Sequence, residues 1–204
     1  MNRTLKLLIA SDTLILGGFG LIAPILAIYV NNDILGGSIA AVGIMTMIFL
    51  LSKTMFQLIF SKVFKPEHRF FMVVLGTLLI AIVPLVYLMS KQVWHFYLAQ
   101  LLYGIGGGLA YPAWFSLFAS NLTKGKEGFE WSVYSGLAGG GAGVAAFIGS
   151  SLASKIGFTV TFFIAGVIAL IGMFILLGLQ KNNLKKVLPS EMFVNKHKGP
   201  NLEH

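Results

Sequence analysis

Apolar residues dominate six stretches of this chain, and short polar segments separate them. Each stretch is long enough to cross the hydrocarbon core of a bilayer, which takes roughly 20 apolar residues in a helix. The pattern predicts membrane-spanning helices at about 6–30, 37–61, 70–89, 94–118, 130–153 and 158–180. We therefore expect an all-α integral membrane domain over residues 1–180. A basic cytoplasmic tail, 181–204, is expected to end in a remnant of an affinity tag.

A glycine–proline motif, G-x-G-L-x-x-P, occurs at residues 18–24 and again 88 residues later at 106–112. Interrupted helices at matching places in two halves are a pointer to a transporter's binding site. We therefore expect hinges in the two motifs, at Gly20, Pro24, Gly108 and Pro112. The alternative is that these residues only permit close helix packing and a kink, since Gly and Pro are common in membrane helices.

The repeat is wider than the motif. Offsets of 88 to 93 residues also relate three further pairs, which are Asp12 with Gln100, Gly43 with Gly136, and Gly76 with Gly166. Each half holds three crossings, so the second half enters the membrane from the opposite face. The chain is thus expected to be a 3+3 inverted repeat.

Composition supports the membrane class, with 56% hydrophobic and 11% charged residues and a mean hydropathy of +0.84. No cysteine is present, which excludes disulfides and thiol chemistry. The net charge of +8 is explained better by basic loops that set topology than by nucleic-acid binding. The N-terminus, the second and fourth loops and the tail are basic, whereas the opposite loops carry only Lys91 and Lys155. We therefore expect a multi-pass protein of the cytoplasmic membrane with both termini cytoplasmic.

Two ionisable residues, Asp12 and Lys53, lie well inside predicted helices. An unpaired charge in hydrocarbon costs at least about 2.5–3.5 kcal/mol, so each is expected to face a cavity or a partner. In the functional interpretation Asp12 binds a proton or a cationic substrate, and Lys53 adjusts its proton affinity. The alternative is a structural ion pair between the two helices, or a Lys53 side chain that extends to the membrane surface.

Helical periodicity aligns candidate cavity residues on two helices. The 94–118 helix carries Gln100, Tyr103, Gly107, Tyr111 and Trp114 on one face. The 6–30 helix carries Asp12, Phe19, Ala23 and Leu26 on one face. Facing inward, these residues form an aromatic cavity with one acid, which suits amphipathic cations. The alternative is ordinary aromatic packing.

No motif points to an enzyme, a cofactor or a metal. Glu127 and Glu130 lie in or beside a polar loop, where a solvated charge is expected. The histidines lack the spacing of metal ligands. The glycine triplets are not phosphate loops, because no strand precedes them and no Gly-Lys-Ser/Thr follows.

Several segments together resemble the N-terminal half of a major facilitator superfamily transporter, over essentially all of residues 5–180. The first motif is similar to that family's first helix, and residues 97–112 resemble its R-x-x-Q-G-x-G helix. Residues 134–152 resemble its glycine-rich fifth helix, and 61–69 lie where the family has G-x-L-x-D-x-x-G-R.

The chain also departs from the family pattern. Arg69 is kept as the remnant of the loop motif, but Lys65 stands where the family has an acid, and Gln100 replaces the arginine of the fourth helix. In the family these two positions are associated with gating and proton coupling, so the resemblance implies the fold more firmly than the coupling. Relatives also carry twelve helices.

The resemblance implies a half transporter that works as a homodimer and exports small hydrophobic or cationic compounds, with proton coupling an open expectation. The expected partners are a second copy, membrane lipid and a small-molecule substrate, and no nucleic acid. Three alternatives stay open: a non-transporting scaffold or accessory subunit, one half of a heteromeric transporter, or an excised half of a longer transporter.

Small residues point to the surface where two copies meet. A stripe on the 130–153 helix is formed by Ser132, Gly136, Gly140, Gly143 and Gly149. By family analogy this helix packs on the 37–61 helix of the second copy through Gly43, Thr46 and Leu50. We therefore expect a parallel homodimer. The alternative is that the glycines pack the 130–153 helix within its own protomer.

Overall fold

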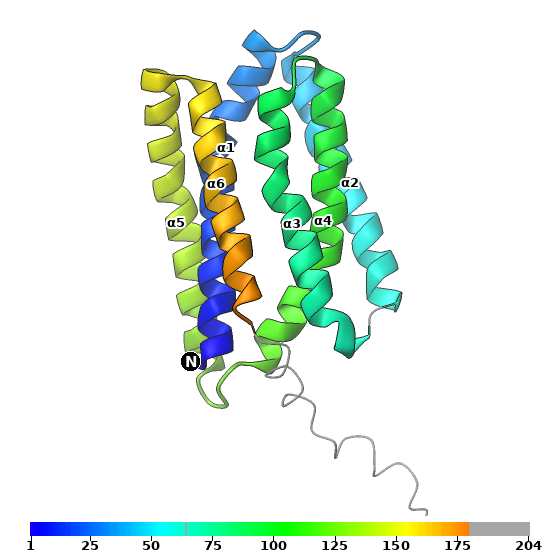
Figure 1. The fold of residues 1–204 in the computed structure, drawn as a ribbon, viewed down its shortest axis with the longest axis vertical. Helices are drawn as coiled ribbons and strands as arrows, with labels where there is room; N and C mark the ends of the chain where they lie inside the picture. Colours follow the sequence, from blue (N-terminus) through cyan, green and yellow to red (C-terminus); the bar gives the residue numbers. More distant parts are fainter. Residues whose placement is uncertain (64, 180–204) are drawn as a thin grey trace, which may run out of the picture.

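The computed structural model describes residues 1–63 and 65–179, which form a bundle of α-helices (Figure 1). In chain order the elements are α1 (Arg3–Asp33), α2 (Ile39–Val63), the 3-10 helix η1 (Pro66–His68), α3 (Arg69–Met89), α4 (Val93–Ser120), α5 (Glu127–Ile156) and α6 (Phe158–Leu177). Each predicted span corresponds to one α-helix, with ends that differ by a few residues. The predicted tail at 181–204 lies outside the described residues.

Five of the helices are long and apolar enough to cross a membrane, and α4 is not among them. α4 has 28 residues, about 42 Å at 1.5 Å per residue, so its length suffices. Its glycines, tyrosines and Gln100 lower its hydropathy. This composition is consistent with its position, because α4 packs along both α2 and α3.

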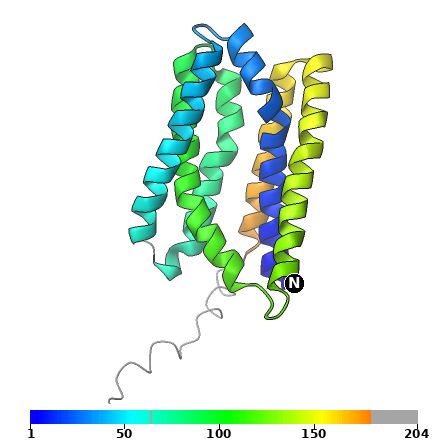
Figure 2. The same ribbon diagram turned by 180° about the vertical axis from the view of Figure 1, so that it is seen from behind.

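The helices form two groups of three. α1 packs along α5 and α6, α4 packs along α2 and α3, and α3 and α6 join the two groups. In Figure 1 the view falls on α3 and α6, with α5 and α2 at the two edges. The reverse view in Figure 2 shows α1 and α4 nearer the viewer, between α5 and α2. α1 and α4 therefore share one face of the molecule.

The glycines of the repeated motif occupy equivalent contacts in the two groups. A Cβ on Gly18 would lie 2.8 Å from the Ala165 carbonyl oxygen of α6, and one on Gly106 would lie 2.8 Å from the Gly76 carbonyl oxygen of α3. Both distances are shorter than real Cβ contacts, so only glycine permits these helices to approach this closely.

The second glycine of each motif faces a different helix. A Cβ on Gly20 would lie 2.8 Å from the Ala142 carbonyl oxygen of α5. One on Gly108 would lie 2.7 Å from Phe56 Cβ of α2. Both motif glycines predicted as hinge positions are therefore close-packing positions in this conformation. Pro24 and Pro112 lie within the continuous helices α1 and α4.

The basic segments gather at one end of the bundle. The start of α1, the α2–α3 connection and the α4–α5 connection lie together at the lower end in Figure 1. These segments carry Arg3, Lys6, Lys62, Lys65, Arg69, Lys124 and Lys126. Lys91 and Lys155 lie at the opposite end, near the C-terminal ends of α3 and α5. The charge asymmetry read along the chain is thus an asymmetry between the two ends of the molecule.

Candidate functional site: a cavity around Asp12

Asp12 lies in the wall of a small cavity enclosed by α1, α3 and α4. The residues that line it are Asp12, Ile15, Leu16, Thr77, Ile80, Tyr103, Ala110, Tyr111 and Trp114. Its volume is about 20 Å³, enough for about one water molecule. The predicted face of α4 supplies three of the lining side chains, Tyr103, Tyr111 and Trp114.

The carboxylate of Asp12 has a partner that the sequence pattern does not reveal. Tyr134 of α5 donates a hydrogen bond from Oη to Asp12 Oδ2 at 2.7 Å. Both side chains are half-buried. The bond joins α1 to α5, and its two residues are 122 positions apart in the chain.

Lys53 is not the ion-pair partner of Asp12. Its ammonium lies over the ring of Tyr111, with Nζ 4.0 Å from the ring centroid, and 5.9 Å from that of Phe49. Neither Asp12 nor Lys53 takes part in an ion pair within the described residues. The predicted structural pair between α1 and α2 is therefore not formed. Asp12 and Lys53 instead approach the same aromatic residue, Tyr111.

A second, larger cavity of about 310 Å³ opens toward the other end of the bundle. Its lining residues are Phe19, Ile22, Ala23, Leu26, Ala27, Val42, Thr46, Phe49, Tyr87, Gln100 and Tyr103. Its polar groups include a buried pair in which Gln100 Nε2 donates to Tyr87 Oη at 3.0 Å. The predicted residues Phe19, Ala23 and Leu26 of α1 face this cavity rather than the one around Asp12.

Three stacked rings line the larger cavity, and the middle ring also lines the Asp12 cavity. Tyr103 of α4 lies between Phe19 of α1 and Phe49 of α2, with centroid distances of 4.6 and 4.2 Å. Tyr103 lines both cavities. Such stacked pairs contribute about 0.5–1.5 kcal/mol each beyond the area that they bury. The stack connects α1 to α2 and α4, which belong to the other helix group.

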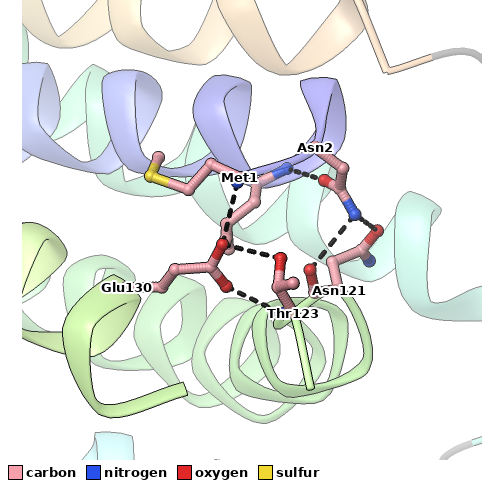
Figure 3. A network of polar contacts seen from close by, with 6 residues as sticks. Met1, Asn2, Asn121, Thr123 and Glu130 are labelled. Atoms are coloured by element: carbon pink, nitrogen blue, oxygen red, sulfur yellow. Dashed lines mark hydrogen bonds and ion pairs between the residues drawn. The ribbon is translucent and has the colours of Figure 1, made fainter. Parts of the chain in front are cut away.

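Glu130 is buried, and the expectation of a solvated charge was wrong. Its side chain is 1% exposed and lies 3.0 Å from the amino group of Met1. It also accepts hydrogen bonds from the backbone N–H of Thr123 at 2.7 Å and from Thr123 Oγ1 at 2.8 Å. Figure 3 shows how these contacts, together with those from Asn2 Nδ2 to Asn121 Oδ1 and O, connect the start of α1 to the α4–α5 connection.

In the described part of the chain, no three His, Cys, Asp or Glu side chains come together that could hold a metal ion. The predicted interface residues on α2 and α5 lie outside both cavities, except Thr46. Thr46 lines the larger cavity.

A six-helix bundle in which five helices are apolar enough to cross a membrane is a multi-pass membrane protein, and its two cavities are lined mainly by apolar and aromatic side chains. The profile of the Major Facilitator Superfamily matches residues 9–200, and the chain belongs to this family. This membership points to a transporter and not to an enzyme.

A relative from Methanocaldococcus jannaschii carries the name "Uncharacterized MFS-type transporter MJ1560". It is 27% identical to this chain over 158 residues, which are 78% of the chain and 40% of the relative. The chain thus spans well under half of that transporter's length.

Proposed function

We propose that the chain forms one half of a secondary transporter that moves small hydrophobic or cationic compounds across the cytoplasmic membrane. One observation carries this proposal: Asp12 is set among apolar helices, beside three aromatic residues and a single tyrosine donor. A carboxylate held there can bind a proton or a positively charged group. The aromatic walls suit the apolar part of such a compound.

Proton coupling is proposed to occur at Asp12. The carboxylate stands at the cavity surface, and it exchanges a proton when the cavity opens to one side of the membrane. The stack of Phe19, Tyr103 and Phe49 supports a barrier between the Asp12 cavity and the larger cavity. A barrier between two cavities is what alternating access requires.

Flux into proteoliposomes tests this function. The purified chain is reconstituted, pH and Na⁺ gradients are imposed separately, and a panel of radiolabelled cationic, neutral and anionic aromatic compounds is supplied. The proposal predicts accumulation of cationic or neutral compounds driven by the pH gradient. Absence of flux for every compound, with the chain folded and inserted, would instead favour an accessory subunit or a half that needs a different partner.

A second six-helix unit is proposed to complete the transport path, and we propose that a second copy supplies it in parallel orientation. α2 and α5 are the least covered helices: 17% and 11% of their most apolar stretches are buried, against 39–50% in α1, α3 and α6. A Cβ added at any of the predicted interface glycines would have no neighbouring atom within 4 Å; these glycines are Gly43, Gly136, Gly140 and Gly143. This supports their use between copies.

Some of the other predicted interface residues support this surface, and others do not. Leu50 is exposed on α2, which supports the same surface, whereas Thr46 lines the larger cavity. Gly149, by contrast, packs inside its own protomer, because a Cβ added there would overlap the Leu21 carbonyl oxygen of α1. The proposed stripe on α5 therefore excludes Gly149.

We further propose that the chain is an inverted repeat with hinges at Pro24 and Pro112. The equivalent roles of Gly18 with Gly106 and of Gly20 with Gly108 support the repeat. Each proline removes a backbone donor within a continuous helix. Replacing both with Ala is expected to slow transport, whereas Pro84→Ala in α3, outside the motif, leaves the rate unchanged. An unaltered rate in the double variant would contradict the hinges.

The basic end of the bundle is proposed to face the cytoplasm, following the positive-inside rule. Single cysteines introduced at Lys65 and at Lys91 test this orientation in intact cells. A thiol reagent that does not cross the membrane is expected to label the cysteine at position 91 and not the one at 65. The reverse pattern would contradict the proposed orientation.

A further inference from the structure

A third cavity opens at the basic end of the bundle, beside η1 and between α2, α3 and α4. Its lining residues in the described part of the chain are Phe60, His68, Phe71, Met72 and Leu109. Its volume is about 330 Å³, which falls in the usual range of ligand pockets, roughly 300–1,000 Å³. None of these residues lines the Asp12 cavity or the larger cavity. The third cavity is therefore a separate space.

The walls of the third cavity suit the acyl chain of a lipid. Phe71 is 65% exposed, Phe60 is half-buried, and Met72 and Leu109 are buried members of the core. Phe71 and Met72 follow Arg69, where the membrane-spanning helix α3 begins, by two and three residues, which is about 3–5 Å along the helix. Apolar side chains at the edge of the bilayer are covered more favourably by a lipid chain than by water.

Basic residues surround the cavity on the side of the α2–α3 connection, which lies at the lower end of the bundle in Figure 1. Residues 62–69 carry the cations Lys62, Lys65 and Arg69 and one acid, Glu67. Lys65 lies one turn from His68, whose backbone N–H donates to the Lys65 carbonyl oxygen at 2.9 Å. Lys62 and Lys65 are exposed, and neither takes part in an ion pair among the described residues. The cations here outnumber the acid, so this rim attracts an anion.

We propose that the third cavity binds one anionic phospholipid of the membrane, with an acyl chain against Phe71 and the phosphate at His68. An imidazole donates a hydrogen bond from N–H in either protonation state. Lys62 and Lys65 attract the headgroup within a Debye length, about 8–10 Å, and each strengthens binding about fivefold. The proposed orientation places this end in the cytoplasmic leaflet, which carries anionic lipid. The site is independent of the compound transported.

Two lipids with identical acyl chains test the assignment. The full chain, freed of lipid in a neutral detergent, is mixed with dioleoylphosphatidylglycerol or dioleoylphosphatidylcholine, and bound lipid is measured by native mass spectrometry. Wild-type protein is expected to bind the anionic lipid at least tenfold more tightly, from the attraction of two basic residues. Lys65→Gln is expected to weaken this binding about fivefold and to leave phosphatidylcholine binding unchanged. Lys91→Gln, at the opposite end of the bundle, is the control that keeps both affinities.

Photolabelling locates the bound chain. Phosphatidylglycerol with a diazirine in one acyl chain is expected to label Phe71 or Met72 of α3 more strongly than Phe163 or Phe174 of α6, which are 56% and 59% exposed. Excess unlabelled dioleoylphosphatidylglycerol is expected to suppress the labelling of α3, and the same amount of dioleoylphosphatidylcholine is not.

Four results would overturn the assignment. They are equal binding of the two lipids by wild type, an unaltered preference in a Lys65→Gln variant that unfolds at the wild-type temperature, labelling of α6 as strong as that of α3, and displacement of phosphatidylglycerol by an equal concentration of glycerol 3-phosphate. The last compound carries the phosphate without the chains, so its success would assign the site to a soluble anion and not to a lipid.

Discussion

At the scale of single residues, the Asp12 carboxylate is energetically costly among apolar helices, and it can bind a ligand or a proton. A carboxylate among apolar helices is expensive, and the hydrogen bond from Tyr134 at 2.7 Å offsets part of the expense. One oxygen of the carboxylate remains for a ligand or a proton. A residue kept in such a place is better explained by binding than by stability, because an apolar side chain would be less costly there.

Removing the tyrosine hydroxyl tests how much the hydrogen bond contributes. Tyr134→Phe is expected to lower the free energy of unfolding by about 0.6–1.7 kcal/mol, the range of interhelical hydrogen bonds in membranes. It is also expected to weaken pH-driven flux, because the carboxylate loses the group that orients it. Both quantities are measured on purified and reconstituted protein.

Tyr97→Phe is the matched control, since the Tyr97 hydroxyl has no hydrogen bond in the described structure and its loss should leave both quantities at wild-type values. Equal stability and flux in Tyr134→Phe and Tyr97→Phe would show that the bond to Asp12 is unimportant.

Asp12 could be predicted from its neighbours in the chain, and its partner could not. An acid inside an apolar run is visible in the sequence, but Tyr134 lies on a distant helix whose glycines dominate its pattern. For Glu130, the prediction from the sequence was wrong. Its local context indicates a loop, yet contacts with Thr123 and with the start of α1 bury it. Burial of a polar residue depends on tertiary contacts that local composition does not encode.

At the scale of elements, the repeated glycines determine how closely α1 and α4 approach their neighbours. Membrane helices gain little from hydrophobic burial against one another, so close backbone contact supplies much of their packing energy. Gly108 brings α4 onto α2, and Gly20 brings α1 onto α5. The apolar pattern of the sequence predicts six helices and their order. It could not predict which glycines serve packing within the protomer, because that depends on which helices are neighbours.

Adding one methyl group tests this role. Gly108→Ala is expected to lower the free energy of unfolding by about 1–3 kcal/mol, because the new Cβ would meet Phe56 Cβ at 2.7 Å and the backbone nitrogen of Gln57 at 2.8 Å. Gly139→Ala is the control, since nothing lies within 4 Å of its Cβ. Reversible unfolding in detergent measures both. A Gly108→Ala protein as stable as the Gly139→Ala protein would contradict the packing role.

At the scale of the whole molecule, the two cavities lie between the two helix groups, and α2 and α5 lie poorly covered at the two edges. Exposed glycines on these edges are poor contacts for lipid but good contacts for another helix. The open edges and the shared face of α1 and α4 are the features that a second six-helix unit would cover.

Measuring the mass of the protein in detergent tests the proposed homodimer. Wild-type protein is expected to be a dimer in several detergents, and Gly140→Leu is expected to be a folded monomer, because the added side chain projects into open space in the protomer. Gly17→Leu on α1, whose Cβ also has nothing within 4 Å, should remain dimeric. A wild-type monomer in every detergent, or a dimeric Gly140→Leu protein, would rule out the proposed interface.

The central claim is that Asp12 couples transport to protons, and uphill accumulation in proteoliposomes tests it most directly. Wild-type and Asp12→Asn proteins are reconstituted at equal density and given the same compound under the same pH gradient. The account predicts that wild type accumulates the compound against its gradient, while Asp12→Asn, which cannot release a proton at this site, folds and assembles but does not accumulate it. Full pH-driven accumulation by Asp12→Asn would contradict the account.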